Sequence, residues 1–448
     1  MTCFLKHFMR FFSLGCLLLG AQINAQVLSE VAAPSHLRSI EFRGETEDQF
    51  PIVRLGETFE LHFDDLQANE QDYFYTIVHC NADWTPSELL KSQYLEGIDN
   101  QRIIDHKNSY NTLVAYSHFR LILPNEVVTP KISGNYMLQV FDTSENIQFS
   151  RKFMIYEDLV PVQAAVKRSR SFESMNSHQL LQFFLNIRAL NLNKPEKELK
   201  VVITKNYQWE TAKYGLQPQF NNGTELKYDY NEPASFYGGN EYLNFDTKDI
   251  RAATATIGRV ALNDIYEHYL YANEARNNKP YTYFPDLNGD FRVRTLQGVI
   301  SEREADYSWV HFRLNPSGQG NEQTKIYILG KFNNYAPTTE YKMSYEASSN
   351  SYKARILFKQ GFYNYSYALG STPSIDKSES MSSNTLDASA LKPAPLKEAD
   401  ISYDPYAISG SFHFTENQYQ IFVYFKGFGD LYERLVGVGG ANAAFIKD

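Results

Sequence analysis

Residues Tyr73–Leu90 read Tyr-Phe-Tyr-Thr-Ile-Val-His-Cys-Asn-Ala-Asp-Trp-Thr-Pro-Ser-Glu-Leu-Leu. The first part of this segment is mostly aromatic or β-branched, which favours a strand that runs through Cys80. A polar Asn-Ala-Asp turn that carries Trp84 follows the strand. The segment therefore predicts a strand and a tight corner, and its features are structural rather than catalytic.

A short helix is predicted directly after this corner. Thr85 can accept a hydrogen bond from the amide of Glu88, and the Glu88 side chain can reach back to the amide of Thr85, which is the pattern of a capping box. Pro86 would then stand at the first helical position, where its missing N–H costs nothing. We expect strand, corner and capped helix within this one segment.

Short aromatic and β-branched runs continue along the chain, which contains 32 Tyr and 31 Phe residues. Runs of this kind, bounded by turn residues, are typical of β-strands. Six or seven of them fall within residues 26–157, and that number in about 130 residues predicts a sandwich of immunoglobulin-like size. The clearest are Phe59–Phe63, Tyr73–Cys80, Phe119–Leu123, Tyr136–Phe141 and Phe149–Tyr156.

Two further β domains are expected, a second β-rich domain over 158–300 and a third sandwich over 301–448. Ala261–Arg276 could also be read as an amphipathic helix, but the aromatic residues of Tyr266–Tyr271 favour a strand. A Ser-rich stretch at 370–404 has few large apolar residues and predicts a long loop. The predicted fold is all-β, a row of three immunoglobulin-like or β-sandwich domains with few short helices. Its later strands include Val162–Arg168, Gln179–Arg188, Leu199–Lys205, Tyr307–Leu314, Tyr352–Lys359 and Gln418–Phe425.

Residues 1–25 have the order of a secretory signal peptide. Lys6 and Arg10 precede the apolar run Phe11–Ala21, and Ala25 supplies the small residue before the expected cleavage point. The run is too short to span a bilayer comfortably, and no other stretch has the length of a transmembrane helix. Two alternatives, a lipid attached at Cys16 and an uncleaved anchor, fit the residues less well.

The charge balance limits the classes of partner. Removal of the signal takes away two of the 43 basic residues and none of the 52 acidic ones, so the formal charge changes from −9 to −11. An acidic chain is a poor match for nucleic acid or for an anionic membrane surface. One cysteine, Cys80, is left, so no internal disulfide can form and the core must hold the fold. Its apolar strand predicts a buried side chain rather than a reactive thiol.

No pattern of catalytic or cofactor-binding residues stands out. Asp286-Leu-Asn-Gly-Asp290 has oxygen ligands at alternate positions, as calcium loops do, but Gly289 and Gln297 depart from that pattern. We therefore read Asn288-Gly289 as the turn of a hairpin. The pair Asp64-Asp65 is read as a turn with solvated charge. We expect no catalytic residue, no metal, no cofactor and no enzyme activity.

The third domain contains the sharpest binding pattern. Ile326-Tyr-Ile-Leu-Gly-Lys-Phe-Asn-Asn-Tyr335 combines a strand, a Phe-Asn turn and an aromatic residue. It resembles the opening of starch-binding and glycogen-binding sandwich modules, in which a Trp that stacks on sugar usually follows the Phe-Asn pair. Tyr335 holds that place here. The resemblance implies the fold more firmly than sugar binding, because sandwich folds carry many functions.

Longer motifs run through the chain after the signal. They are 51–58 (Pro-Ile-Val-Arg-Leu-Gly-Glu-Thr), Leu61–Leu66, His79–Ser87, Leu90–Gly97, Tyr110–Leu113, Leu123–Glu126, Ser133–Tyr136, Gly238–Glu241, Phe245–Arg251, Asp286–Asp290, Ala305–Tyr307, Lys359–Tyr365 and Tyr432–Gly437. Together they resemble the type IX secretion system plug proteins of the Bacteroidetes, and the resemblance covers essentially the whole chain after residue 25.

The resemblance implies a non-enzymatic periplasmic protein that docks on the periplasmic opening of the giant outer-membrane β-barrel translocon of this system and closes it. It also implies a monomer when free and no direct insertion into the membrane. It marks no docking residue, and Trp84 fits a core position as well as a contact. The alternative from another class is a secreted or periplasmic carbohydrate-binding protein that uses the third domain. Exposed aromatic residues in a planar row would favour that alternative, and a buried aromatic set would count against it.

Overall fold

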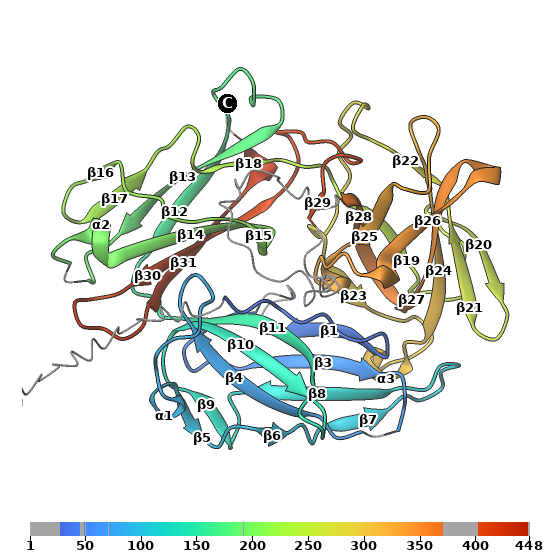
Figure 1. The fold of residues 1–448 in the computed structure, drawn as a ribbon, viewed down its shortest axis with the longest axis horizontal. Coiled ribbons are helices and arrows are strands. Elements are labelled where there is room, and N and C mark those ends of the chain that lie inside the picture. Colours follow the sequence, from blue (N-terminus) through green and yellow to red (C-terminus); the bar gives the residue numbers. More distant parts are fainter. Residues whose placement is uncertain are drawn as a thin grey trace, which may run out of the picture.

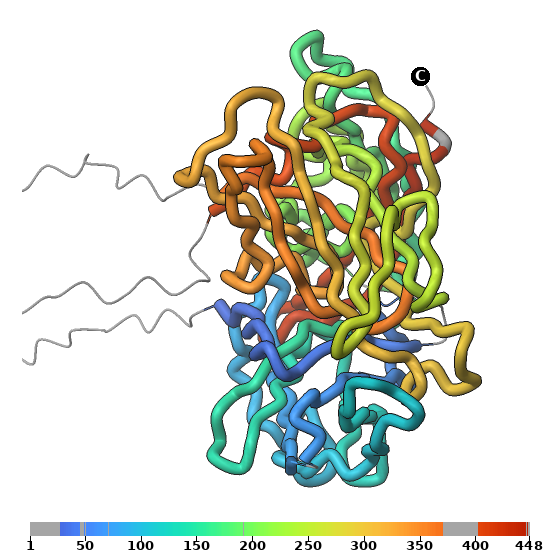
Figure 2. Tube along the Cα trace, turned by 90° about the vertical axis from the view of Figure 1, so that its right-hand side faces the viewer, coloured from blue at the N-terminus to red at the C-terminus, as the bar shows by residue number. Residues whose placement is uncertain are grey.

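The computed structural model consists of three β domains that contact one another in a triangle (Figure 1). It describes residues 27–44, 49, 51–69, 71–190, 192–370 and 402–446. The first domain lies at the base and touches both others, and it keeps that place when the molecule is turned by 90° (Figure 2). The predicted all-β series of domains is confirmed. The three domains form a closed triangle rather than an open row, because the third domain also contacts the first. The expected signal peptide (1–25) and most of the expected loop (370–404) lie outside the described residues.

The first domain is a sandwich of a four-stranded and a five-stranded sheet. Aromatic side chains fill the space between the sheets: Phe63 stacks on Phe119 with 5.0 Å between ring centroids, and Tyr73 meets both rings edge-on. Such a core accounts for the alternating pattern of the strands. The sheets are β1 (Leu37–Arg43), β3 (Phe59–Asp65), β8 (Ser117–Leu123), β7 (His106–Asn108) and β2 (Ile52–Arg54), β11 (Ile147–Tyr156), β10 (Gly134–Phe141), β4 (Phe74–Cys80), β6 (Gln101–Arg102), with the ribbon β5 (Leu95–Gly97) and β9 (Val128–Pro130) beside them.

The helix predicted to begin at Thr85 is wrong in its position. Asp83 accepts hydrogen bonds from both the amide and the hydroxyl of Thr85, at 3.0 and 2.6 Å. The amide of Ser87 donates to the carbonyl of His79, which folds the chain back along the end of β4 in an extended path. The helix α1 (Lys91–Tyr94) begins only after this extended path ends. A local side-chain acceptor has therefore outcompeted the expected cap.

The second domain packs two sheets around an aliphatic and aromatic core. Phe183 stacks on Tyr228 with 4.4 Å between ring centroids, and Ile203 and Ile421 are fully buried on the facing sheet. The first sheet contains β12 (Val162–Arg168), β13 (His178–Asn186), β17 (Glu225–Tyr228), β16 (Phe220–Asn221) and β18 (Ser235–Tyr237); the second contains β15 (Gln208–Lys213), β14 (Leu199–Lys205), β30 (Gln418–Phe425) and β31 (Arg434–Asn442), and α2 (Pro195–Glu198) precedes β14.

The third domain is one long sheet that wraps around its own core. Phe245, Phe291 and Tyr363 stack inside it, with centroid distances of 5.1 and 5.3 Å to Tyr363. Along the sheet stand β19 (Leu243–Asp246), β28 (Gly361–Gly370), β25 (Lys325–Leu329), β26 (Lys342–Glu346), β27 (Ser351–Lys359), β24 (Tyr307–Asn315), β21 (Tyr266–Leu270) and β20 (Ile257–Leu262); β22 (Asn273–Glu274), β23 (Phe291–Val293) and β29 (Tyr403–Asp404) attach at its sides, and α3 (Ser301–Glu304), η1 (Lys331–Asn333), η2 (Thr339–Tyr341) and η3 (Ala347–Ser349) lie in its loops.

Sheet pairing divides the second and third domains differently from the sequence expectation of 158–300 and 301–448. Strands β30 and β31 complete the sheet of β14, with Leu199 opposite Phe425. Strands β19 to β23 pair within the sheet of the third domain. The third domain is therefore inserted into the second, and the chain returns after it. The sequence could not show this, because alternating strands carry no mark of the sheet that they join.

Candidate functional site

The notable chemistry of the described residues lies where the domains meet. Among these residues no three His, Cys, Asp or Glu side chains gather as a metal-binding group. None of the helices in the described ranges is long and apolar enough to cross a membrane. The first domain has two such boundaries, the first–third seam around Asp64 and the first–second seam around Trp84.

A buried ion pair forms the centre of the first–third seam. Asp64 on β3 and Lys359 at the end of β27 lie 2.6 Å apart, and their side chains are 0% and 1% exposed. Asp64 also lies 2.6 Å from His118 and accepts a hydrogen bond of 2.6 Å from the Tyr307 hydroxyl. Lys359 donates in addition to the main-chain oxygen of Glu302 at 2.8 Å. Each buried charge is thus paired and hydrogen-bonded, as burial requires.

The interpretation of Asp64-Asp65 as a solvated turn is wrong. Both residues end β3 and are fully buried. Because neighbouring residues of a strand point to opposite faces, Asp64 faces the seam while Asp65 accepts a hydrogen bond of 3.0 Å from Tyr73 in the core. Burial would raise the pKa of Asp64, but Lys359 and His118 outweigh burial and hold this pKa below its ordinary value of 3.8.

Charged and main-chain groups continue the first–third seam around this pair. Asp306 accepts hydrogen bonds from the amides of two residues of the first domain, Leu113 at 2.7 Å and Val114 at 3.0 Å. These bonds tie loops that are far apart in the chain. Further links are Tyr116 to the carbonyl of Ala305 (2.8 Å), Arg43 to Glu302 (2.5 Å), Ser39 to Tyr307 (2.8 Å) and Arg38 to Glu340 and Tyr341.

Aromatic side chains form the centre of the first–second seam. Trp84, from the corner after β4, is 1% exposed and meets Trp209 edge-on at 4.8 Å between centroids. Trp209 stacks on Phe422 at 5.3 Å. The Lys152 ammonium lies 4.7 Å from the Trp84 ring and 5.8 Å from the Trp209 ring, within cation–π range. Trp84 is therefore a buried seam residue of this chain.

Polar contacts and one thiol surround the aromatic centre. Glu433 accepts a hydrogen bond of 2.8 Å from the amide of Ala82, and Tyr424 donates one of 2.8 Å to Asn135. Cys80 belongs to the same apolar cluster and is fully buried, as the sequence predicted. Burial raises the pKa of this thiol to about 12. Its position makes Cys80 a reporter for opening of this seam.

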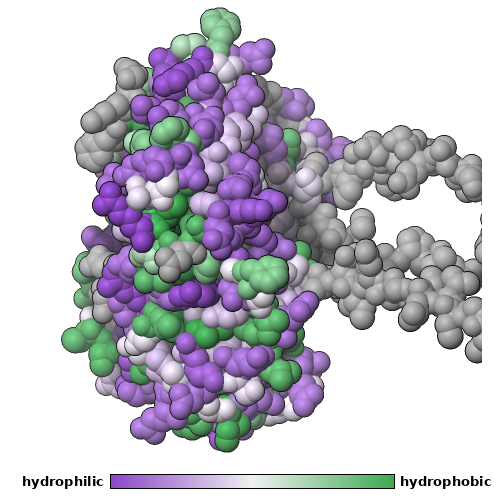
Figure 3. All heavy atoms as spheres, turned by 90° about the vertical axis from the view of Figure 1, so that its left-hand side faces the viewer, coloured by the Kyte–Doolittle hydropathy of each residue, from purple (hydrophilic) through white to green (hydrophobic). Residues whose placement is uncertain are grey.

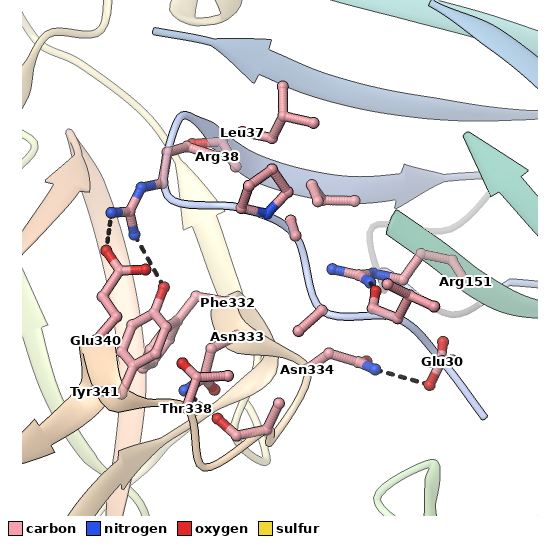
Figure 4. Close-up of a pocket in the computed structure, with 17 residues that line it drawn as sticks. Glu30, Leu37, Arg38, Arg151, Phe332, Asn333, Asn334, Thr338, Glu340 and Tyr341 are labelled. Carbon is pink, nitrogen blue, oxygen red and sulfur yellow. Dashed lines mark hydrogen bonds and ion pairs between the residues drawn. The ribbon is translucent and has the colours of Figure 1, made fainter. Parts of the chain in front are cut away.

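A small pocket opens where the segment after Val27 crosses the third domain (Figure 4). Arg151 reaches into it from β11, and its Nη1 donates to the carbonyl of Ser150 at 2.8 Å. On the other wall Asn334 donates to Glu30 at 2.7 Å (Figure 4). The cavity volume of about 60 Å³ suits a few water molecules rather than an organic substrate. We interpret this pocket as part of the first–third seam.

The aromatic residue that was expected to stack on sugar is buried. Tyr335 is 9% exposed, and its hydroxyl lies 3.4 Å from the carbonyl of Asn288. Asn333 of the Phe-Asn turn uses its amide group on main-chain atoms of Gly330 and Ile328, at 3.1 and 3.0 Å. The turn therefore stabilises the fold of the third domain, and this observation counts against the carbohydrate-binding alternative at this place.

The Asp286–Asp290 segment forms the predicted turn but not the predicted hairpin. Asn288 and Gly289 have φ of +53° and +88°, as a tight turn of this type requires. Strand β23 follows the turn, whereas no strand directly precedes it. Asp286 accepts hydrogen bonds from main-chain amides at 2.5 and 2.6 Å, and burial together with the charge of Glu241 raises its pKa to about 7.

Sequence reasoning missed the partners that give the seams their chemistry. Lys359 stood at the end of an expected strand, Trp209 lay outside the expected strands, and no local signal distinguishes either residue. Asp64 and Lys359 are separated by 295 positions. Only the packing of whole domains brings such residues together.

The fold and the buried seams define a three-domain β-sandwich protein. The sequence model of one family, described as the type 9 secretion system plug protein 1st domain, matches residues 37–157. This range begins with β1 and ends directly after β11, so it is the first domain of the structure. Over residues 37–157 the chain is therefore similar to the first domain of the plug proteins, which confirms the resemblance seen in the sequence for this range. The match supports a role in type IX secretion.

No curated protein matches the chain. Among solved structures, the crystal structure at 2.30 Å resolution of a hypothetical protein from Parabacteroides merdae ATCC 43184 is similar. The two chains are 28% identical with a TM-score of 0.81, and the alignment covers 93% of this chain and 100% of the other. The similarity therefore extends over all three domains.

Proposed function

We propose that this protein is a non-enzymatic periplasmic plug. It docks on the periplasmic opening of the giant outer-membrane translocon of the type IX secretion system and closes that opening. The observation that carries the proposal is the family match over 37–157, because this range is a complete domain rather than a short motif. Buried contacts in both seams join this domain to the other two.

A plug needs a body that keeps its shape. Association costs conformational entropy, and a partner that is already ordered loses little of it on docking. The seams supply such order: the Asp64–Lys359 pair fixes the first domain to the third, and the Trp84–Trp209 contact fixes it to the second. The triangular arrangement presents a body that is wider than any one sandwich (Figure 1).

A plug must also be released. Large apolar interfaces belong to permanent complexes, whereas reversible ones are smaller and more polar. The face shown in Figure 3 carries apolar side chains in scattered groups among polar ones, without one continuous apolar area. This side of the molecule, the left-hand side of Figure 1, therefore offers no large apolar interface of the kind that permanent complexes use.

Recovery of partners tests the proposal. The tagged mature protein is captured from gently solubilised outer membranes, and the proteins retained are identified by mass. We expect a very large β-barrel protein as the main partner. Recovery of no membrane partner, together with retention of the protein on glucan or peptidoglycan, would contradict the proposal and favour a binding module.

Deletion of the gene tests the gating role separately. Without the plug, the outer membrane should admit large hydrophilic compounds, and the gene supplied in trans should restore the barrier. Unchanged permeability in a deletion strain that still contains the translocon would contradict closure.

A further inference from the structure

The outer face of the third domain carries an ordered row of basic and aromatic side chains. Arg355, His311, Tyr269 and Arg259 are register partners on β27, β24, β21 and β20, so they lie side by side across four strands. The rings of His311 and Tyr269 stack with 4.1 Å between centroids and an angle of 9°. Strands β20 and β21 stand at the right of Figure 1 and at the front of Figure 2.

Aromatic rings hold the guanidinium groups of this row in place. The Arg259 guanidinium carbon lies 3.7 Å from the centroid of Tyr269, and that of Arg355 lies 4.0 Å from the centroid of Trp309. Glu267 supports the centre, because it accepts hydrogen bonds from Tyr269 at 2.7 Å and from Arg355 at 2.9 Å. A guanidinium that is stacked on a ring has already lost much of its conformational freedom. It therefore loses less conformational entropy when it binds a carboxylate through two parallel hydrogen bonds.

Positive charge on this face is in excess. Arg313 and Lys353 are register partners in the next row, and Lys353 forms an ion pair with Glu346. Among the residues that the structure describes, neither Arg259 nor Arg313 has a carboxylate within ion-pair distance, although both side chains are exposed. Two guanidinium groups are thus unpaired on a protein whose formal charge is −9.

We propose that this basic–aromatic face (Arg259, Tyr269, His311, Arg313 and Arg355) docks against an acidic protein patch at the periplasmic opening of the translocon. The proposal rests on the plug function proposed above. Two stacked arginines stand at the ends of the row, three strand spacings or about 14 Å apart, and Arg313 extends the positive charge beside them. Such a face selects carboxylates in a fixed arrangement, and charge complementarity adds speed and orientation to the encounter.

Other occupants fit the face less well. A nucleic acid or an anionic membrane presents uniform negative charge, which the acidic chain as a whole repels. A sugar binds by stacking on the open face of an aromatic ring. The guanidinium groups of Arg259 and Arg355 already lie over the rings of Tyr269 and Trp309. A discrete acidic patch on a protein meets neither obstacle. A second copy of this acidic chain is the remaining protein candidate, and a measurement of self-association distinguishes it from the translocon.

The test reverses the two unpaired charges, Arg259→Glu with Arg313→Glu. The matched control reverses two exposed, unpaired cations on the other domains, Lys107→Glu with Arg170→Glu, and has the same net charge. Binding to the translocon barrel, purified in detergent and immobilised, is measured between 50 and 500 mM NaCl; these salt values are roughly the range over which surface charges become screened. We expect the test variant to bind about tenfold or more weakly at low salt and the control to stay near the wild-type affinity.

The outcomes separate the two proposals. Equal binding by wild type, test variant and control would overturn the docking face and leave the plug function intact. Absence of binding by the wild-type protein would contradict both. Self-association of the wild type by light scattering, lost in the test variant, would assign the face to a second copy and overturn the translocon as its partner. Circular dichroism spectra of both variants check that each is folded.

Discussion

The two seams of the first domain use opposite chemistry for the same task. The first–third seam depends on a desolvated ion pair between Asp64 and Lys359, whereas the first–second seam depends on the rings of Trp84, Trp209 and Phe422. Paired charges that are buried away from water permit few arrangements. Loss of one partner is strongly destabilising, because the other charge is then buried and unpaired. Aromatic packing is less directional and scales with the area buried. The first–third seam therefore fixes the orientation of the domains, and the first–second seam adds stability through buried apolar area.

Removal of Lys359 should have the largest effect on stability. Lys359→Met leaves Asp64 buried without its cation, which costs about 3–5 kcal/mol. Urea unfolding measures the loss. The double variant Asp64→Asn with Lys359→Met is the control, because it removes both charges and should recover part of the loss. A single variant as stable as the wild type would contradict the role given to the pair.

Truncation of Trp209 should have the next largest effect. Trp209→Ala removes an aromatic ring and leaves a cavity against Trp84. Because this ring is only partly buried, the free energy of unfolding should fall by about 3 kcal/mol, at the lower end of the range for such substitutions. The loss should not depend on a second substitution at Lys359, because the two seams share no partners. Strong non-additivity in the double variant would show that the seams are coupled.

Acid should weaken the first–third seam selectively. The pKa of Asp64 is lower in the folded protein than its ordinary value of 3.8. The stabilisation that ionised Asp64 gives to the folded state is therefore complete above pH 3.8 and is lost as the pH falls through the lowered pKa. Between pH 5 and pH 2, about the range where carboxylates titrate, the wild type and Trp209→Ala should lose stability in parallel. The uncharged Asp64→Asn/Lys359→Met variant should lose less. Parallel loss in all three proteins would contradict the assignment.

Labelling of Cys80 should give the smallest but most local signal. The thiol is buried in the first–second seam, and burial raises its pKa to about 12. Alkylation should be slow in the native wild type, faster in Trp209→Ala, and less affected by Lys359→Met when the rates are compared at equal stability. Equal acceleration by both substitutions would mean that Cys80 reports global unfolding rather than opening of one seam.

Local structure was largely predictable from the sequence. The strands expected at Val162–Arg168, Leu199–Lys205 and Gln418–Phe425 have the bounds of β12, β14 and β30, because aromatic and β-branched alternation is a local signal. The helix at Thr85 failed for an equally local reason, the competing carboxylate of Asp83.

Arrangement in space was not predictable in the same way. The insertion of the third domain into the second depends on β30 reaching β14, more than 200 positions away in the chain. The Asp64–Lys359 pair and the row from Arg355 to Arg259 arise from register between distant strands. A single sequence contains the alternation of each strand but not the identity of its neighbours.

Closure of the translocon is the central claim, and conductance tests it most directly. The purified barrel is inserted in a planar lipid bilayer, and the mature protein is added to the periplasmic side while the current is recorded. We predict that the large open-channel conductance falls to a closed level and returns when the protein is washed out. A conductance that stays open at protein concentrations that saturate binding to the barrel would contradict the plug function.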